Sequence, residues 1–164
     1  MDTTRAKLFD RLEALGIASW TVEHPPMFTV EQSQSLRGQL PGAHTKNLFL
    51  KDKDDRLVLV VAKEDTKVDL KKLAKELGFG RFSFGKPDLL MAALGVEPGS
   101  VTAFALINES SRDLAAVVVD EALMAFAQVN CHPLVNSATT RLGTQNLLRF
   151  MRDCGHEPLI VQLG

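Results

Sequence analysis

The chain has 164 residues, 45% of them hydrophobic and 24% charged, and a formal net charge of -1 at pH 7. These values are typical of a soluble globular protein that can bury a core, and we expect one domain over residues 1–164. They exclude a uniformly basic surface that coats nucleic acid, and since the sequence shows neither a membrane-spanning run nor a signal peptide, we expect a cytoplasmic protein.

The N-terminal part of the chain predicts two helices and a strand. A first helix should begin at Thr3 or Thr4 and end at Gly16, because three leucines recur on one of its faces. Residues 20–23 alternate between apolar and polar side chains, as a short strand does. A capping box then indicates a short helix over residues 29–36.

The middle of the chain predicts a hairpin and two helices. Residues 46–51 and 56–61 form apolar strands around a turn of aspartates and a lysine. Helices follow over residues 69–77 and 87–94, each closed by a glycine. A strand fragment at residues 82–84 separates them.

The C-terminal part gives the strongest strand predictions, residues 101–107 and 114–119, which we expect to be joined by a polar turn. A short helix or turn should follow at residues 121–125. Thr144 should cap a late helix, and residues 158–163 should form a closing strand. Because the strands and helices alternate irregularly, the sequence predicts an α+β fold rather than repeated βαβ units.

Lys46 is the most informative residue, because it lies where a loop becomes an apolar strand. Burying an unpaired ammonium group costs several kcal/mol. A lysine at this place therefore either reaches water along its aliphatic stem or binds an anionic ligand. Taken alone, a solvated lysine is the simpler interpretation.

Two loops also contain residues that could bind a substrate. Residues 94–102 include two glycines and a proline, and the backbone N–H groups of such a loop can hold a carbonyl or phosphate oxygen. Residues 130–140 are polar and contain His132. The structural alternative for the first loop is that it only ends a helix and turns the chain. The alternative for the second is that His132 is a core histidine whose hydrogen bonds are satisfied within the protein.

Standard catalytic motifs and metal-ligand spacings are missing from the sequence. Cys131 and His132 are adjacent, but neighbouring residues of a strand point to opposite faces, so they do not form a nucleophile and its base. The lysine, histidine, glycine loop, amides and hydroxyls favour positioning of a polar, anionic substrate.

Several segments together resemble a known family: residues 24–29, 44–50, 78–84, 94–108 and 132–136. In this order they are similar to the free-standing bacterial aminoacyl-tRNA editing proteins of the YbaK/prolyl-tRNA synthetase insertion-domain superfamily. The nearest branch is PrdX, or ProXp-ala, which hydrolyses alanine mischarged on proline tRNA. The resemblance implies a mixed, curved β-sheet flanked by helices.

The resemblance also implies residue roles. Lys46 would hold the terminal phosphate or sugar of the tRNA 3′ end, and His132 would line the aminoacyl pocket; we take both as candidate catalytic residues. The glycine loop is one residue shorter than the G-x-x-x-P segment of the superfamily. The implied substrate-binding residues are Thr45, Asn47, Gly99, Ser100, Val101 and Asn136. The implied tRNA-binding residues are Arg81, Lys71 and Lys75.

The implied reaction is hydrolysis of Ala-tRNA(Pro), with a positioned water, help from the terminal ribose hydroxyl and no metal or cofactor. Proline would be excluded by its size. The expected partners are the acceptor stem and 3′ end of tRNA(Pro), with prolyl-tRNA synthetase as a transient partner and no membrane. Two alternatives remain: a deacylase for cysteine or serine, and a module that binds tRNA or a synthetase without turnover.

Overall fold

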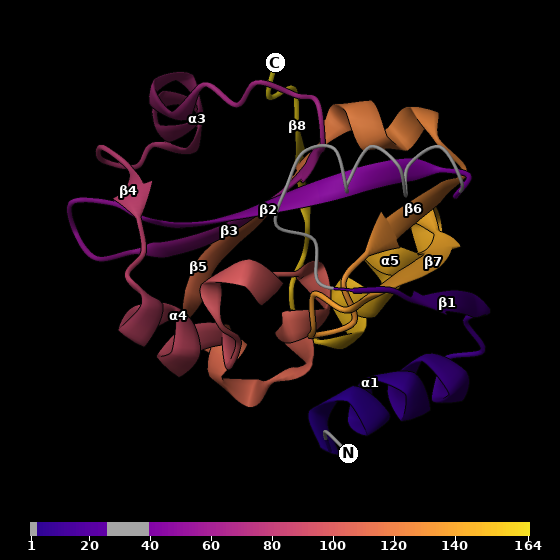
Figure 1. Ribbon diagram of the computed structural model, residues 1–164. Coiled ribbons are helices and arrows are strands. Elements are labelled where there is room, and N and C mark those ends of the chain that lie inside the picture. The colour runs from indigo at the N-terminus through magenta and orange to yellow at the C-terminus, as the bar shows by residue number, and fades with distance from the viewer. Residues whose placement is uncertain (1–2, 26–39) are drawn as a thin grey trace.

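The computed structural model describes residues 3–25 and 40–164, which fold into an eight-stranded mixed sheet with helices on both faces (Figure 1). The strand order is β1-β7-β6-β2-β3-β5-β8, and β4 pairs with β2. The strands are β1 (Ser19–Glu23), β2 (Ala43–Lys51), β3 (Leu57–Lys63), β4 (Ser83–Phe84), β5 (Leu114–Asp120), β6 (Gln128–Cys131), β7 (Ala138–Gly143) and β8 (Leu159–Val161). The α-helices are α1 (Thr3–Ala14), α3 (Leu70–Leu77), α4 (Pro87–Leu94) and α5 (Thr144–Asp153). This architecture confirms the predicted α+β class.

The central strand β3 separates two hydrophobic cores. Its side chains are almost completely buried from Leu57 to Ala62, because helices cover both faces of the sheet. The larger core collects residues from α1, α4 and α5, and the smaller core lies beneath α3. Figure 1 shows α3 on one side of β2 and β3, with α1 and α4 on the other. No helix in the described part of the chain is long and apolar enough to cross a membrane.

The boundaries of α3 and α4 agree with the sequence predictions. The Asp69 side chain accepts a hydrogen bond from the Lys72 N–H, which satisfies one free donor of the first turn of α3. Gly78 and Gly95 end the two helices with φ values of 71° and 69°, in the left-handed region that glycine adopts without strain. A polar N-cap for α3, a proline at the start of α4 and the two glycines were sufficient signals for these boundaries.

The predicted strand over residues 101–107 is wrong. The structure has two short 3₁₀ helices instead, η1 (Pro98–Ser100) and η2 (Ala103–Ile107). The Thr102 hydroxyl accepts a hydrogen bond from the Phe104 N–H and starts η2, and all five residues of η2 are buried. A short run that is apolar on every side fits a buried strand and a buried helical turn equally well.

The topology after η2 also differs from the prediction. Another 3₁₀ helix, η3 (Glu109–Asp113), precedes β5, which pairs in parallel with β3 and β8 rather than forming a hairpin. The 3₁₀ helix η4 (Glu121–Ala125) lies where a short helix or turn was expected. The closing strand β8 is shorter than predicted, and the helix predicted over residues 29–36 lies outside the described residues.

Two strands, β6 and β7, were missed because the polar residues 130–140 were interpreted as a loop. The cap predicted at Thr144 is wrong as well. Gly143 is the N-cap of α5, and the Thr144 hydroxyl donates to the Phe126 carbonyl instead. The prediction failed because threonine can satisfy its hydroxyl through a tertiary contact.

Candidate functional site

The candidate site lies at a gap in the sheet along one edge of β2. One edge of β2 pairs with β3 from Thr45 to Lys51. The other edge pairs with β6 at Ala43 and His44 and with β4 at Leu50 and Lys51. Between these pairings, no strand in the described part of the chain is paired with residues 45–49 on this side. We call this stretch the open edge.

The open edge presents backbone polar groups. The Glu64 N–H donates to the His44 carbonyl on the β3 side, and the Gly85 N–H donates to the Phe49 carbonyl on the opposite side. Peptide groups of alternate residues point to opposite edges of an antiparallel strand. The N–H and carbonyl of Asn47 therefore face the open edge, where they can bind the polar groups of a ligand.

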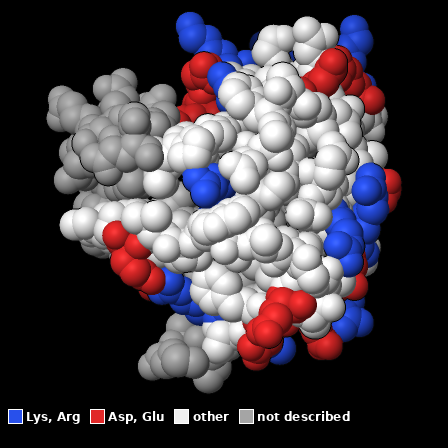
Figure 2. Space-filling model, turned by 90° about the vertical axis from the view of Figure 1, so that its right-hand side faces the viewer, with Lys and Arg blue, Asp and Glu red and all other residues white. Residues whose placement is uncertain are grey.

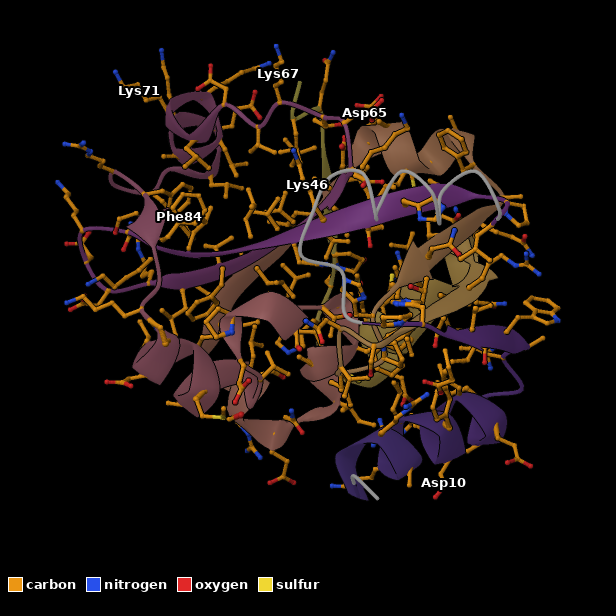
Figure 3. The ribbon with its side chains drawn as sticks, viewed as in Figure 1. Asp10, Lys46, Asp65, Lys67, Lys71 and Phe84 are labelled. Atoms are coloured by element: carbon orange, nitrogen blue, oxygen red, sulfur yellow. The ribbon has the colours of Figure 1, made fainter. Side chains whose placement is uncertain are left out.

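Lys46 and Asn47 lie on opposite faces of β2. Lys46 lies on the face of Leu48 and Leu50, which pack in the smaller core, and Figure 3 shows it on the side of β2 that faces α3. Asn47 lies on the face of Phe49, in the larger core. Successive strand residues alternate in this way, so a ligand at the open edge would be flanked from both faces.

Each of these side chains has a polar group without a partner among residues 3–25 and 40–164. No hydrogen bond or ion pair joins the half-buried Lys46 to the residues that the structure describes. The Oδ1 atom of Asn47 is buried and accepts no hydrogen bond. Buried polar atoms are nearly always paired in folded proteins, so the unpaired Asn47 Oδ1 beside the open edge is available to accept a hydrogen bond from a ligand.

His132 follows the short ladder between β2 and β6. His44 pairs with Asn130 at the end of this ladder, and His132 lies two residues after Asn130, just beyond the end of β6. The Nδ1 atom of His132 lies 3.2 Å from the Ala138 carbonyl. Because a carbonyl can only accept, Nδ1 carries the proton, and Nε2 of the neutral ring is left as an acceptor.

The environment of His132 favours this neutral form. Burial lowers the pKa of His132, and the nearby His24 lowers it further, while the hydrogen bond to Ala138 acts in the opposite direction. The Nε2 atom of His24 lies 2.8 Å from the Thr139 hydroxyl. Sequence reasoning assigned no role to His24 or Thr139; the His24-Pro25 pair within the resembling segments was the available signal.

Thr45 connects β2 to β6. Its hydroxyl donates to the Asn130 carbonyl at 2.8 Å and lies 3.6 Å from the Cys131 sulfur. Burial raises the pKa of the Cys131 thiol to about 12, although the contact with Thr45 acts in the opposite direction. The thiol is therefore protonated at neutral pH, consistent with the sequence argument against a cysteine nucleophile.

The glycine loop approaches the segment after His132. A Cβ atom added at Gly99 would lie 3.4 Å from Nδ2 of Asn136, so the structure brings these two predicted substrate-binding residues together. Ser100 and Val101, which follow in the same loop, are half-buried. The loop and the segment that contains Asn136 thus form one polar region next to the larger core.

The predicted tRNA-binding residues lie on the surface, away from the open edge of β2. Lys71 and Lys75 are exposed on α3, and Arg81 is exposed after it. Figure 3 places Lys71 on the outer side of α3, away from β2. These cations are therefore available to a large ligand that extends beyond the open edge. No cluster of three or more potential metal ligands occurs among residues 3–25 and 40–164.

Comparisons with known proteins identify the family. Residues 24–150 match the sequence model of the aminoacyl-tRNA editing domain. The chain is 37% identical to prolyl-tRNA synthetase associated domain-containing protein 1 of Danio rerio over 158 residues, covering 96% of this chain and 86% of that protein. It is 32% identical to the prolyl-tRNA editing protein ProX of Acetoanaerobium sticklandii over 164 residues, covering 99% of each.

A solved structure shows the same fold. It is described as a candidate trans-editing enzyme for prolyl-tRNA synthetase and aligns with a TM-score of 0.74 at 19% identity, over 100% of this chain and 99% of that one. This likeness concerns the fold alone. With the match over residues 24–150, the chain belongs to the aminoacyl-tRNA editing domain family.

Proposed function

We propose that the protein is a trans-editing deacylase that hydrolyses the ester of alanine mischarged on tRNA(Pro). The observation that carries this proposal is a pair of polar groups, the Lys46 ammonium and Asn47 Oδ1, which lie on the two sides of the open edge of β2 and have no partner in the described part of the chain. Membership of the editing-domain family supplies the class of substrate. The protein would act as one domain.

Lys46 would hold the terminal phosphate or sugar of the tRNA 3′ end, since an ammonium on a flexible stem suits a phosphate oxygen. The ester would lie along the open edge, where the peptide group of Asn47 can contact its polar atoms. Water would add to the ester carbonyl carbon, the bond to the ribose oxygen would break, and that oxygen would leave with a proton. An aminoacyl ester is already activated, so a positioned water is sufficient.

His132 would contribute as an acceptor. Its neutral ring leaves Nε2 free to accept a hydrogen bond from an O–H or N–H of the attacking water or the bound ester. Asn136 and the Gly99 loop would border the amino-acid side chain, and Thr45, Ser100 and Val101 would line the same region. An editing pocket of this kind excludes proline by size.

The outer cations would contact the RNA. Arg81, Lys71 and Lys75 would meet phosphates of the acceptor stem, while prolyl-tRNA synthetase would associate only transiently. The net charge of -1 fits binding by a few local contacts rather than by a general positive field.

The proposal is tested by measuring release of labelled amino acid from four matched substrates, Ala-, Pro-, Cys- and Ser-tRNA(Pro), with the unmodified protein. We expect release of alanine and retention of proline. Preferential release of cysteine or serine would keep the enzyme class and replace the substrate. Release of none of the four, despite binding of the tRNA, would make the protein a binding module.

A further inference from the structure

We propose that Phe84 is a stacking platform for a base in the single-stranded 3′ end of the tRNA, one of the two cytidines before the terminal adenosine. This inference rests on the proposed function, because it concerns how the same substrate is held. It assigns a substrate-binding role to a residue that the reaction itself does not use.

Phe84 is the most exposed large apolar residue in the described part of the chain. Its side chain is 63% exposed. Phe82, two residues earlier, is only 7% exposed and belongs to the smaller core. A large, exposed aromatic ring on a segment that is paired with β2 can contact a ligand without rearrangement of the backbone.

The backbone holds the ring in a fixed place. Phe84 pairs with Leu50 on β2, and the Gly85 N–H donates to the Phe49 carbonyl at 2.9 Å. A Cβ atom at Gly85 would lie 2.3 Å from the Phe49 ring, so glycine permits this close approach. A ring anchored in this way can stack on a base with little loss of backbone freedom.

Phe84 and Lys46 lie along the same edge and the same face of β2. Paired residues of an antiparallel ladder share a face, so Phe84 lies on the face of Leu50, and Lys46 lies four residues before Leu50. Four residues of a strand span about 13 Å. That span suits a ligand of a few nucleotides whose terminal phosphate or sugar reaches Lys46; Figure 3 shows both side chains along β2.

The surroundings of Phe84 favour RNA. The ring borders a cavity of about 430 Å³ that is also lined by Ser83, by two lysines, Lys51 and Lys86, and by residues of α4. The Nζ atom of Lys51 lies 3.3 Å from Oδ1 of Asp55, and Asp88 also lines the cavity. The positive charge of the two lysines is therefore partly offset. Aromatic rings and cations that line one groove are the elements with which proteins bind single strands, through stacked bases and paired phosphates.

The test uses an uncharged RNA hairpin with the acceptor stem of tRNA(Pro), ending in CCA, with a fluorescent cytidine analogue at one of the two cytidines at a time. Phe84→Ala should weaken binding by about 5- to 150-fold. Phe84→Trp should keep the wild-type affinity for the hairpin, and the affinity of Phe84→Leu should lie between those of wild type and Phe84→Ala. Trp20→Ala, which removes a 49% exposed aromatic from β1, is the matched control and should change nothing.

The RNA is uncharged, so the result does not depend on turnover. Quenching of the analogue by wild type and by Phe84→Trp, lost in Phe84→Ala, would support the stacking role even if no deacylation occurred. Equal affinity of wild type and Phe84→Ala for the hairpin would overturn it, whether or not alanine is released. Loss of prolyl-tRNA synthetase binding in Phe84→Ala, with RNA binding unchanged, would also overturn it and assign the ring to a protein contact.

Discussion

Asn47 has a side-chain oxygen for which the described residues provide no partner. Its Oδ1 atom is buried without a hydrogen bond, whereas Thr45 on the same face donates to the Asn130 carbonyl. Leaving a buried acceptor unpaired costs about 1–3 kcal/mol. Residues that lower stability in this way are expected at functional sites, where the missing partner is the ligand.

Asn47→Leu should therefore raise stability and lower activity. Removing the unpaired oxygen should increase the free energy of unfolding by about 1 kcal/mol, as measured by urea denaturation. Deacylation of Ala-tRNA(Pro) should fall in the same variant, because the amide can no longer contact the ester. A less stable variant with unchanged turnover would show that Asn47 is structural.

The pH dependence of deacylation should report His132. Protonation would remove its Nε2 acceptor, and burial lowers its pKa below the ordinary 6.5. Activity should therefore persist as pH falls through 6.5 and decline only at lower pH. The contribution of His132 to stability has the same sign: it is complete above 6.5 and is lost as pH falls toward the lower folded value.

His132→Gln is the matching variant. It should slow deacylation about 100-fold, as expected for loss of a general acid–base group. It should also abolish the decline in activity at low pH, which we call the acidic limb of the pH profile. An unchanged limb in this variant would assign the pH dependence to another group. A rate loss without any change in pH dependence would limit His132 to shaping the pocket.

At the level of whole elements, the site depends on how β2 leaves β6. Gly42 precedes β2 with a φ of 91°, and a Cβ atom there would lie 2.8 Å from the Gln128 carbonyl oxygen. Only glycine satisfies both the left-handed backbone and this contact. The residue sets the start of the open edge, because β2 and β6 separate after His44.

Gly42→Ala should lower the free energy of unfolding by about 1–3 kcal/mol from backbone strain, with a further loss from the contact with Gln128. Gly155→Ala is the control, since Gly155 has a φ of 90° and open space around it. Thermal unfolding should show the larger loss for Gly42→Ala, and only this variant should slow deacylation. Equal effects would mean that the approach of β2 to β6 is unimportant.

Local signals predicted the elements that they directly control. The caps of α3 and α4, the β2–β3 hairpin and the apolar face of α1 followed from residues close in sequence. The 3₁₀ helix η2 and the strands β6 and β7 did not, because their form depends on burial against distant elements. Parallel pairing of β5 with β3 and β8 likewise has no local signal.

The same distinction holds for the site. The sequence indicated Lys46, His132 and the glycine loop as candidates, and the contact of Gly99 with Asn136 joins two segments that it indicated separately. It could not predict that β2 changes partners between β6 and β4, since that depends on strand pairing. Lys46 and Asn47 lie on opposite faces of β2, and only the position of the open edge shows that they can flank one ligand.

Over the whole molecule, the positive charge is concentrated in one segment and is not spread evenly over the surface. Figure 2 shows a face on which uncharged residues predominate and charged groups collect mainly toward the margins. The segment from residue 63 to residue 86 carries seven basic and four acidic residues, although the chain as a whole has a net charge of -1. RNA binding should therefore involve few phosphate contacts, and these should be made by the basic segment over residues 63–86.

The salt dependence of binding to the acceptor-stem hairpin should reflect this. Lys71→Ala and Lys75→Ala should each reduce the slope of log affinity against log salt concentration by about 1, without changing which RNA sequence is preferred. Lys7→Ala, an exposed lysine on α1, should leave the slope unchanged. A steep slope that none of these substitutions alters would place the RNA on another surface.

The central claim is that the open edge of β2 binds the aminoacyl ester with Lys46 on the 3′ end of the tRNA. It is tested most directly by the single-turnover rate of alanine release from Ala-tRNA(Pro) for wild type, Lys46→Ala and the control Lys7→Ala. We predict a rate about 100- to 1,000-fold lower for Lys46→Ala, the range for loss of one preorganised polar contact, and no change for Lys7→Ala. Alanine release by Lys46→Ala at the wild-type rate would contradict the claim.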